Sequence, residues 1–188
     1  MNEGRVDLNE YFMGIAIAVR ERADCKGQKV GAVLVKDDRI IATGYNGTPE
    51  GFKNCSDGGC VRCLNRGKLY KSGTAYDLCI CVHAEQNAIL SAARFGIKTE
   101  GAVLYTTVQP CFGCLKESLQ AKIRRIIYLH PWISDRDKDH ESQYRRLQNE
   151  FPDGVQILEM TDHRKEWASS RSSVPLVSSP DPHGTELQ

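Results

Sequence analysis

The chain has 188 residues, of which 40% are hydrophobic and 26% are charged. This composition is typical of a soluble globular protein, and the length suits one domain with a substantial core. Lysine and arginine number 25 against 24 aspartate and glutamate, a balance that argues against a dedicated nucleic-acid binder. The longest apolar run, residues 11–19, is too short to cross a bilayer, and the polar start predicts no signal peptide. We therefore expect no membrane association and a cytoplasmic location.

Apolar spacing predicts one helix and a hairpin in the first part of the chain. Residues 8–22 have a helical apolar face, and Arg20, Glu21 and Arg22 close this helix on the polar side. Residues 30–35 and 39–43 are β-rich and flank a turn signal, so they predict two antiparallel strands. The loop at 44–49 follows the second strand, where it forms either a plain turn or a place that holds substrate groups.

Residues 46–82 hold few large apolar side chains, so this insert is not expected to bury a core of its own. A bound zinc would organise it, as zinc organises a finger. Cys60 and Cys63 have the spacing of a zinc-ligand pair. The segment and the chain just before it contain more cysteines than one tetrahedral zinc needs, so the choice of four ligands stays open. Free thiols are the alternative.

The second part of the chain predicts alternating helices and strands, with helices at 84–95, 111–121 and 139–150 and strands at 102–108, 124–129 and 155–160. A strand, a helix and a strand in this order predict a parallel pair with a right-handed crossover. Trp132 follows the second of these strands, where it would either stack on a base or pack half-buried. Residues 168–188 are rich in serine and proline and predict a disordered tail.

His83, Cys111 and Cys114 are the expected ligands of a catalytic zinc. The two cysteines are three residues apart near a helix start, so both sulfurs face one way. Three protein ligands leave one tetrahedral position open for a water. Glu85 does not share a helix face with His83, which predicts a proton carrier. A closed structural site is the alternative, but it would require a fourth ligand and would have no use for Glu85.

His-x-Glu followed by Pro-Cys-x-x-Cys is the signature of zinc nucleobase deaminases. Over residues 11–160 the chain resembles the deoxycytidylate (dCMP) deaminases of the cytidine deaminase superfamily, and in particular a cysteine-rich fungal-type subgroup. The matching pieces are Val30-Gly31-Ala32-Val33, Gly44-Tyr45-Asn46-Gly47-Thr48-Pro49, Cys55, Gly58-Gly59-Cys60-Val61-Arg62-Cys63, Cys79-Ile80-Cys81-Val82-His83-Ala84-Glu85-Gln86-Asn87-Ala88-Ile89 and Pro110 to Cys114.

The resemblance implies a three-layer α/β fold, with a mixed five-stranded sheet between helices, in a domain of residues 1–167. It implies hydrolysis of dCMP to dUMP, which would supply thymidylate synthesis. Asn46 would contact the sugar and the Ala84 backbone the base, and Thr48 and Trp132 are further candidate substrate contacts. For a second, structural zinc the resemblance adds to the Cys60 and Cys63 pair three more candidates, Cys25, Cys55 and Cys81.

The resemblance also implies a homo-oligomer, a hexamer or a dimer, with Arg94 at subunit contacts. It further implies activation by dCTP and inhibition by dTTP. Gln109 and residues 130–132 depart from the family pattern near the nucleotide, which leaves the phosphate requirement open. The alternatives are a deaminase of modified dCMP, cytidine, deoxycytidine, guanine or tRNA adenosine, and a non-catalytic zinc-binding module.

Overall fold

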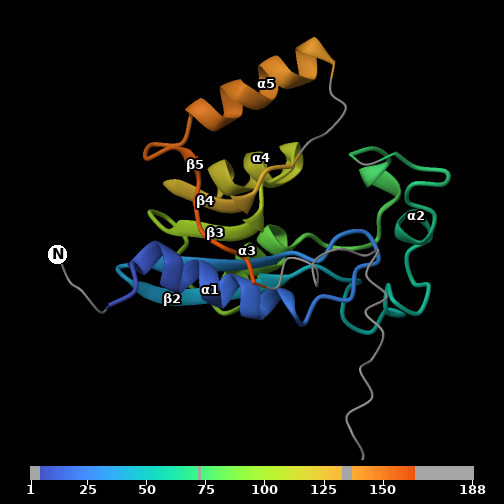
Figure 1. The fold of residues 1–188 in the computed structure, drawn as a ribbon, viewed down its shortest axis with the longest axis horizontal. Helices are drawn as coiled ribbons and strands as arrows, with labels where there is room; N and C mark the ends of the chain where they lie inside the picture. Colours follow the sequence, from blue (N-terminus) through green and yellow to red (C-terminus); the bar gives the residue numbers. More distant parts are fainter. Residues whose placement is uncertain (1–4, 72, 133–136, 164–188) are drawn as a thin grey trace, which may run out of the picture.

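The computed structural model describes residues 5–71, 73–132 and 137–163, and its centre is a mixed five-stranded sheet (Figure 1). The strand order is β2-β1-β3-β4-β5. The strands are β1 (Gly31–Lys36), β2 (Arg39–Tyr45), β3 (Val103–Val108), β4 (Arg125–His130) and β5 (Val155–Ile157). β1 pairs antiparallel with both β2 and β3, whereas β3, β4 and β5 run parallel. The predicted hairpin and the predicted parallel pair are both confirmed.

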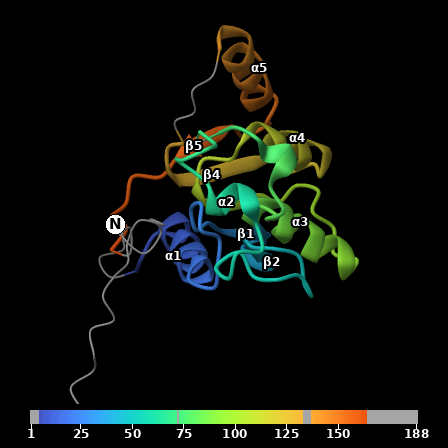
Figure 2. The same ribbon diagram turned by 90° about the vertical axis from the view of Figure 1, so that its right-hand side faces the viewer.

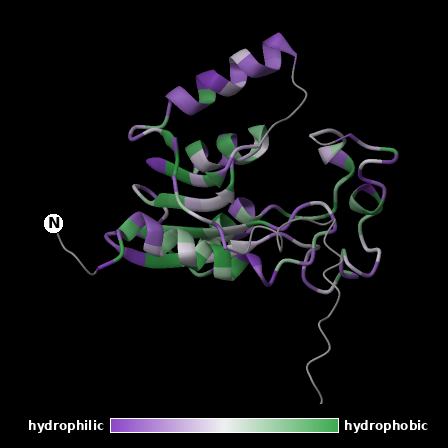
Figure 3. Ribbon diagram, in the orientation of Figure 1, coloured by the Kyte–Doolittle hydropathy of each residue, from purple (hydrophilic) through white to green (hydrophobic). Residues whose placement is uncertain are grey.

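Helices cover both faces of this sheet. They are α1 (Leu8–Arg20), α3 (Ala84–Arg94), α4 (Phe112–Gln120) and α5 (Lys138–Asn149). Side chains alternate between the faces of a strand, so Val33 and Val35 pack with α1, whereas Ala32 and Leu34 pack with α3. Apolar residues concentrate in the strands, while α5 is largely hydrophilic (Figure 3). The expected three-layer fold is confirmed.

Two glycines let helices pack directly on strands. A Cβ at Gly31 would overlap the backbone of α1 at Ala16, and a Cβ at Gly44 would overlap the backbone of α3 at Ala84 and Ala88. Gly44 was predicted to open a loop, but β2 continues through it to Tyr45. Its lack of a side chain serves the close contact between β2 and α3, whose first turn carries the site described below.

Arg20 is buried, so the prediction that it closes α1 on the polar side is wrong. Its guanidinium donates to the Asp162 carboxylate at 2.8 and 3.1 Å, and His130 Nε2 lies 2.7 Å from Asp162 Oδ2. The chain after β5 runs back toward α1 (Figure 1), where Leu158 and Met160 pack on the α1 core. Asp162 arrives on this segment, and its charge compensates that of Arg20 in the interior.

Residues 46–82 lie at one end of the sheet, at the right in Figure 1 and facing the viewer in Figure 2. They contain the short helix α2 (Val61–Leu64) and the 3-10 turn η1 (Tyr76–Leu78). β3 and β4 end on this side, a favoured place for ligands in α/β folds. None of the helices among the described residues has both the length and the apolar character needed to cross a membrane. The predicted tail, residues 168–188, lies outside the described residues.

Candidate active site

His83, Cys111 and Cys114 meet at the starts of two helices. His83 precedes α3, Cys111 precedes α4, and Cys114 lies in the first turn of α4. His83 Nδ1 is 3.4 Å from each sulfur, and the two sulfurs are 3.6 Å apart. Zinc with bonds of about 2.3 Å to sulfur and about 2.0–2.1 Å to nitrogen would hold tetrahedral ligands roughly 3.5–3.8 Å apart. The three predicted ligands therefore fit one zinc.

The three ligands shift one another's pKa values, and Cys111 and burial raise the pKa of the Cys114 thiol well above its ordinary value. A metal must therefore displace protons from Cys114 and His83 when it binds. The hydrogen bond with Cys114 lowers the pKa of Cys111 to about 4, and His83 adds to this effect. Burial alone would lower the pKa of His83, but the neighbouring Cys111 raises it to about 9. The thiolate at Cys111 is the form that coordinates a metal.

Glu85 lies next to the three ligands, one residue into α3. It is only 4% exposed, and burial raises the pKa of its carboxyl to about 7. A carboxyl with such a pKa both accepts and releases a proton near neutral pH. The structure thus places Glu85 in the setting that a proton carrier needs.

Gln86 joins the two halves of the metal centre, and the sequence analysis did not single it out. Its side-chain carbonyl accepts from the His83 backbone N–H at 2.8 Å, while its amide donates to Glu117 on α4 at 2.9 Å. A glutamine three residues after the N-cap is a known signal for the start of a helix, so the sequence could have indicated the Gln86–His83 contact. The second joins residues 31 positions apart and has no local signal.

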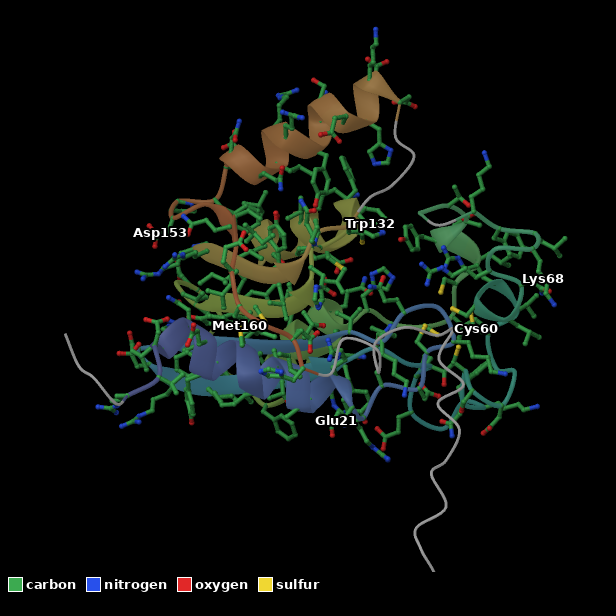
Figure 4. All side chains as sticks on the ribbon, viewed as in Figure 1. Glu21, Cys60, Lys68, Trp132, Asp153 and Met160 are labelled. Carbon is green, nitrogen blue, oxygen red and sulfur yellow. The ribbon has the colours of Figure 1, made fainter. Side chains whose placement is uncertain are left out.

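A pocket opens beside the metal centre, between the sheet end and the insert. The sheet end contributes Gln109 and Trp132, and the insert contributes Arg62, Arg66 and Tyr76. His83 and Glu85 also line this pocket. Figure 4 shows Trp132 on the side of the sheet that faces the insert. Its backbone N–H donates to the Gln109 side chain at 3.1 Å, which ties Trp132 to the residue that follows β3.

Three of the four predicted substrate-contact residues line the pocket. Asn46, Ala84 and Trp132 line the pocket, whereas Thr48 is not among its lining residues. Asn46 is buried, and its amide bonds to backbone on both sides: it donates to Gln28 O at 2.7 Å and accepts from Val30 N at 2.8 Å. Asn46 therefore fixes the backbone of the pocket edge at residues 28–30.

A second group of sulfurs lies beside this pocket, where cysteines of the insert meet Cys25 of the chain before it. The candidates from the sequence, Cys25, Cys55, Cys60, Cys63 and Cys81, are brought together there and are all buried. Cys79 joins them, although it was not among the candidate ligands. Figure 4 labels Cys60 in this cluster of yellow sulfurs. All six cysteines are unpaired thiols.

Comparison with known sequences gives one family. Residues 6–130 match the family described as "Cytidine and deoxycytidylate deaminase zinc-binding region". Deoxycytidylate deaminase of Schizosaccharomyces pombe is 41% identical over 127 residues, which is 68% of this chain and 38% of that protein. The Saccharomyces cerevisiae enzyme is 38% identical over 145 residues, 77% and 43% of the two chains. The chain thus spans about two fifths of each yeast relative. Deoxycytidylate deaminase of Mycobacterium phage D29 is 44% identical over 128 residues, 66% of this chain and 95% of that protein.

Solved structures agree with this result. The dCMP deaminase from the cyanophage S-TIM5 in apo form has a TM-score of 0.59 and 28% identity, covering 82% of this chain and 99% of its own. The same enzyme in complex with dCMP and dUMP has a TM-score of 0.58 and 29% identity, covering 83% and 98%. The chain belongs to the cytidine and deoxycytidylate deaminase family.

Proposed function

We propose that this protein is a zinc-dependent hydrolase that converts dCMP to dUMP and ammonia, and so supplies dUMP for thymidylate synthesis. The observation that carries this proposal is a three-ligand metal centre with a buried glutamate beside it, at the wall of a pocket. The yeast and phage relatives that share this family are named deoxycytidylate deaminases. A closed structural zinc site would have no use for Glu85.

Each site residue has a role in this reaction. Zinc held by His83, Cys111 and Cys114 would supply a water acidic enough to act as nucleophile near neutral pH. Glu85 accepts the proton of the water that attacks C4 of cytosine and delivers a proton to N3. It then assists the departure of the amine, so that the C4–N bond breaks and ammonia leaves. Burial raises the pKa of the Glu85 carboxyl above its ordinary value, which favours its taking up a proton from the water.

Arg66 is our candidate for binding the substrate phosphate. Arg62 and Arg66 bring guanidinium groups to the pocket wall. Arg62 donates to Thr74 O at 2.9 and 3.2 Å and lies 4.9 Å from the centre of the Tyr76 ring. Arg66 lies against Gly27, where a Cβ would be 3.4 Å from its Nη1. A guanidinium at a pocket wall suits the paired oxygens of a phosphate.

Ammonia release from dCMP, CMP, deoxycytidine, a 5-substituted dCMP and guanine tests the function. We expect dCMP to give the highest kcat/KM. Arg66→Gln is expected to lose about tenfold or more with dCMP, since a charge-assisted bond contributes about 1.5–3 kcal/mol, and to leave deoxycytidine turnover unchanged. Lys68→Gln removes an exposed cation of the same insert and serves as the control. Turnover of another substrate above dCMP would contradict the proposal.

Further parts of the proposal concern the whole protein. The buried thiols of the insert support a second, structural zinc. Exposed apolar residues near the end of α3, with Leu90 53% and Phe95 75% exposed, support a homo-oligomer, a hexamer or a dimer, whose contacts include Arg94.

Eight unpaired cysteines support a cytoplasmic location, where thiols stay reduced. Regulation by dCTP and dTTP rests on the family resemblance. The buried pair of Arg20 and Asp162 supports a deaminase domain that extends to about residue 167.

A further inference from the structure

The cysteine cluster of the insert contains two sets of four sulfurs. Within each set all Sγ atoms lie within 4.8 Å of one another, and the sets have two members in common. One set is Cys25, Cys55, Cys63 and Cys81, and the other is Cys60, Cys63, Cys79 and Cys81. Cys63 and Cys81 therefore lie where the two sets meet, and each of the other four sulfurs belongs to one set.

The spacing of the sulfurs is that of zinc tetrahedra. With Zn–S bonds of about 2.3 Å, the sulfurs of a tetrahedral site lie about 3.8 Å apart. Cys63 Sγ is 3.6 Å from Cys25 in the first set, 3.6 Å from Cys79 in the second, and 3.9 Å from Cys81 in both. Cys60 and Cys79 are 3.8 Å apart. A disulfide requires about 2.05 Å, so these distances do not describe oxidised pairs.

We propose that the six cysteines bind two Zn²⁺ ions as a binuclear cluster. In this cluster the thiolates of Cys63 and Cys81 bridge the metals, and the remaining four cysteines each bind one metal. The proposal rests on the structural metal proposed above and adds one more ion to the insert. A single zinc in the first set would leave Cys60 unused, although its side chain is fully buried. Two metals make all six sulfurs ligands and account for six cysteines where one zinc needs four.

The surroundings suit an anionic metal cluster. Two Zn²⁺ ions and six thiolates leave a net charge of −2, which must be compensated in the interior. The backbone amides of Lys26 and Gly27 donate to the sulfurs of Cys55 and Cys25, both at 3.3 Å. The Arg62 guanidinium is buried one residue from the bridging Cys63. The two amide contacts are outer hydrogen bonds of the kind that metal thiolates require, and Arg62 adds a buried positive charge close to Cys63 in the sequence.

The cluster also supports the pocket wall. Cys63, Cys79 and Cys81 belong to the cluster and line the pocket. Arg62 and Arg66, which line it too, lie within three residues of Cys63. Metal binding at the cluster would therefore fix the wall on which the substrate rests.

The test is ¹¹³Cd NMR on the full chain loaded with ¹¹³Cd, together with native mass spectrometry of the zinc form. We expect three metals per chain and three cadmium signals. Two of these signals should come from all-thiolate sites and be split by mutual coupling, which requires a shared ligand. Two metals per chain, or thiolate signals without mutual coupling, would overturn the binuclear cluster while the second zinc stands. One metal, or iron with sulfide, would overturn both. Ammonia release from dCMP tests the proposed activity independently.

Matched variants separate the two metals. Cys60→Ser/Cys79→Ser should lose one metal, from three to two, and keep a single unsplit thiolate signal. Cys25→Ser/Cys55→Ser should give the same result from the other set. Cys111→Ser/Cys114→Ser is the control, which should lose the third signal and retain the coupled pair. An unchanged metal count in either of the first two variants would contradict the proposal.

Discussion

The Glu85 carboxyl is buried beside three metal ligands without being needed to complete their set. Glu85→Gln preserves its volume but removes its capacity to carry a proton. We expect this variant to retain wild-type zinc content by native mass spectrometry, while kcat for dCMP falls by about 10²–10⁴ or more. Glu100→Gln removes a carboxylate from the exposed Glu100–Lys122 pair and should leave both quantities unchanged. Near wild-type turnover in Glu85→Gln would refute the assigned role.

The residues of the metal centre could be predicted because their signals are local. His83 and Glu85 lie in one short motif, and Cys111 and Cys114 lie in another. Each motif can therefore be recognised in the sequence without knowledge of the fold. The contacts that position them are different. The Gln86–Glu117 and Gln109–Trp132 hydrogen bonds join segments 31 and 23 residues apart. They depend on how helices and strands pack, which residue spacing does not reveal.

Two glycines in different surroundings test how closely α3 must approach β2. Gly44→Ala places a Cβ into the backbone of α3 at Ala84 and Ala88, and overpacking of this kind costs about 1–3 kcal/mol. We expect Gly44→Ala to lower the urea midpoint of unfolding. We also expect it to reduce the zinc content, because the ligand His83 lies directly before the first turn of α3. Gly14→Ala in α1 is the matched control. A Cβ there meets nothing within 4 Å, and alanine should stabilise the helix by about 0.5–1 kcal/mol. Equal stability of the two variants would argue against close packing at Gly44.

The Arg20–Asp162 pair joins the end of α1 to the chain beyond β5. Both side chains are 1% exposed, so Asp162→Ala removes a buried carboxylate to which the Arg20 guanidinium donates two hydrogen bonds. Breaking a buried pair in this way costs about 3–5 kcal/mol, and urea denaturation should show this loss. Glu141→Ala breaks the exposed Arg145–Glu141 pair of α5 and should cost about 0.5 kcal/mol or less. A loss below 1 kcal/mol for Asp162→Ala would show that the pair does not stabilise the fold.

Hydrophobic periodicity predicted the central sheet and its helices because these elements bury apolar side chains in regular patterns. The same periodicity gave a wrong prediction for Arg20, because a charged residue on a helix is expected to be exposed unless a buried partner is known. Asp162 is 142 residues away, and no local pattern connects the two. In the insert, composition indicated a metal and the Cys60-x-x-Cys63 spacing indicated two ligands. Only the fold shows that Cys79 belongs to the cysteine cluster and that Cys63 and Cys81 belong to both sets of four sulfurs.

At the scale of the whole molecule, the sheet and the insert are held by different forces. The sheet core is aliphatic and aromatic, whereas the buried core of the insert consists of cysteines and its leucines 64, 69 and 78 are 48–73% exposed. We therefore expect metal binding to supply the folding free energy of the insert. Chelation should speed amide hydrogen exchange in residues 46–82 and leave β1, β3 and β4 protected. Cys111→Ser/Cys114→Ser, which lacks only the zinc of the active site, should keep the insert protected until the chelator is added. If metal loss is verified and the insert remains protected, the insert is stabilised by its own packing and not by metal.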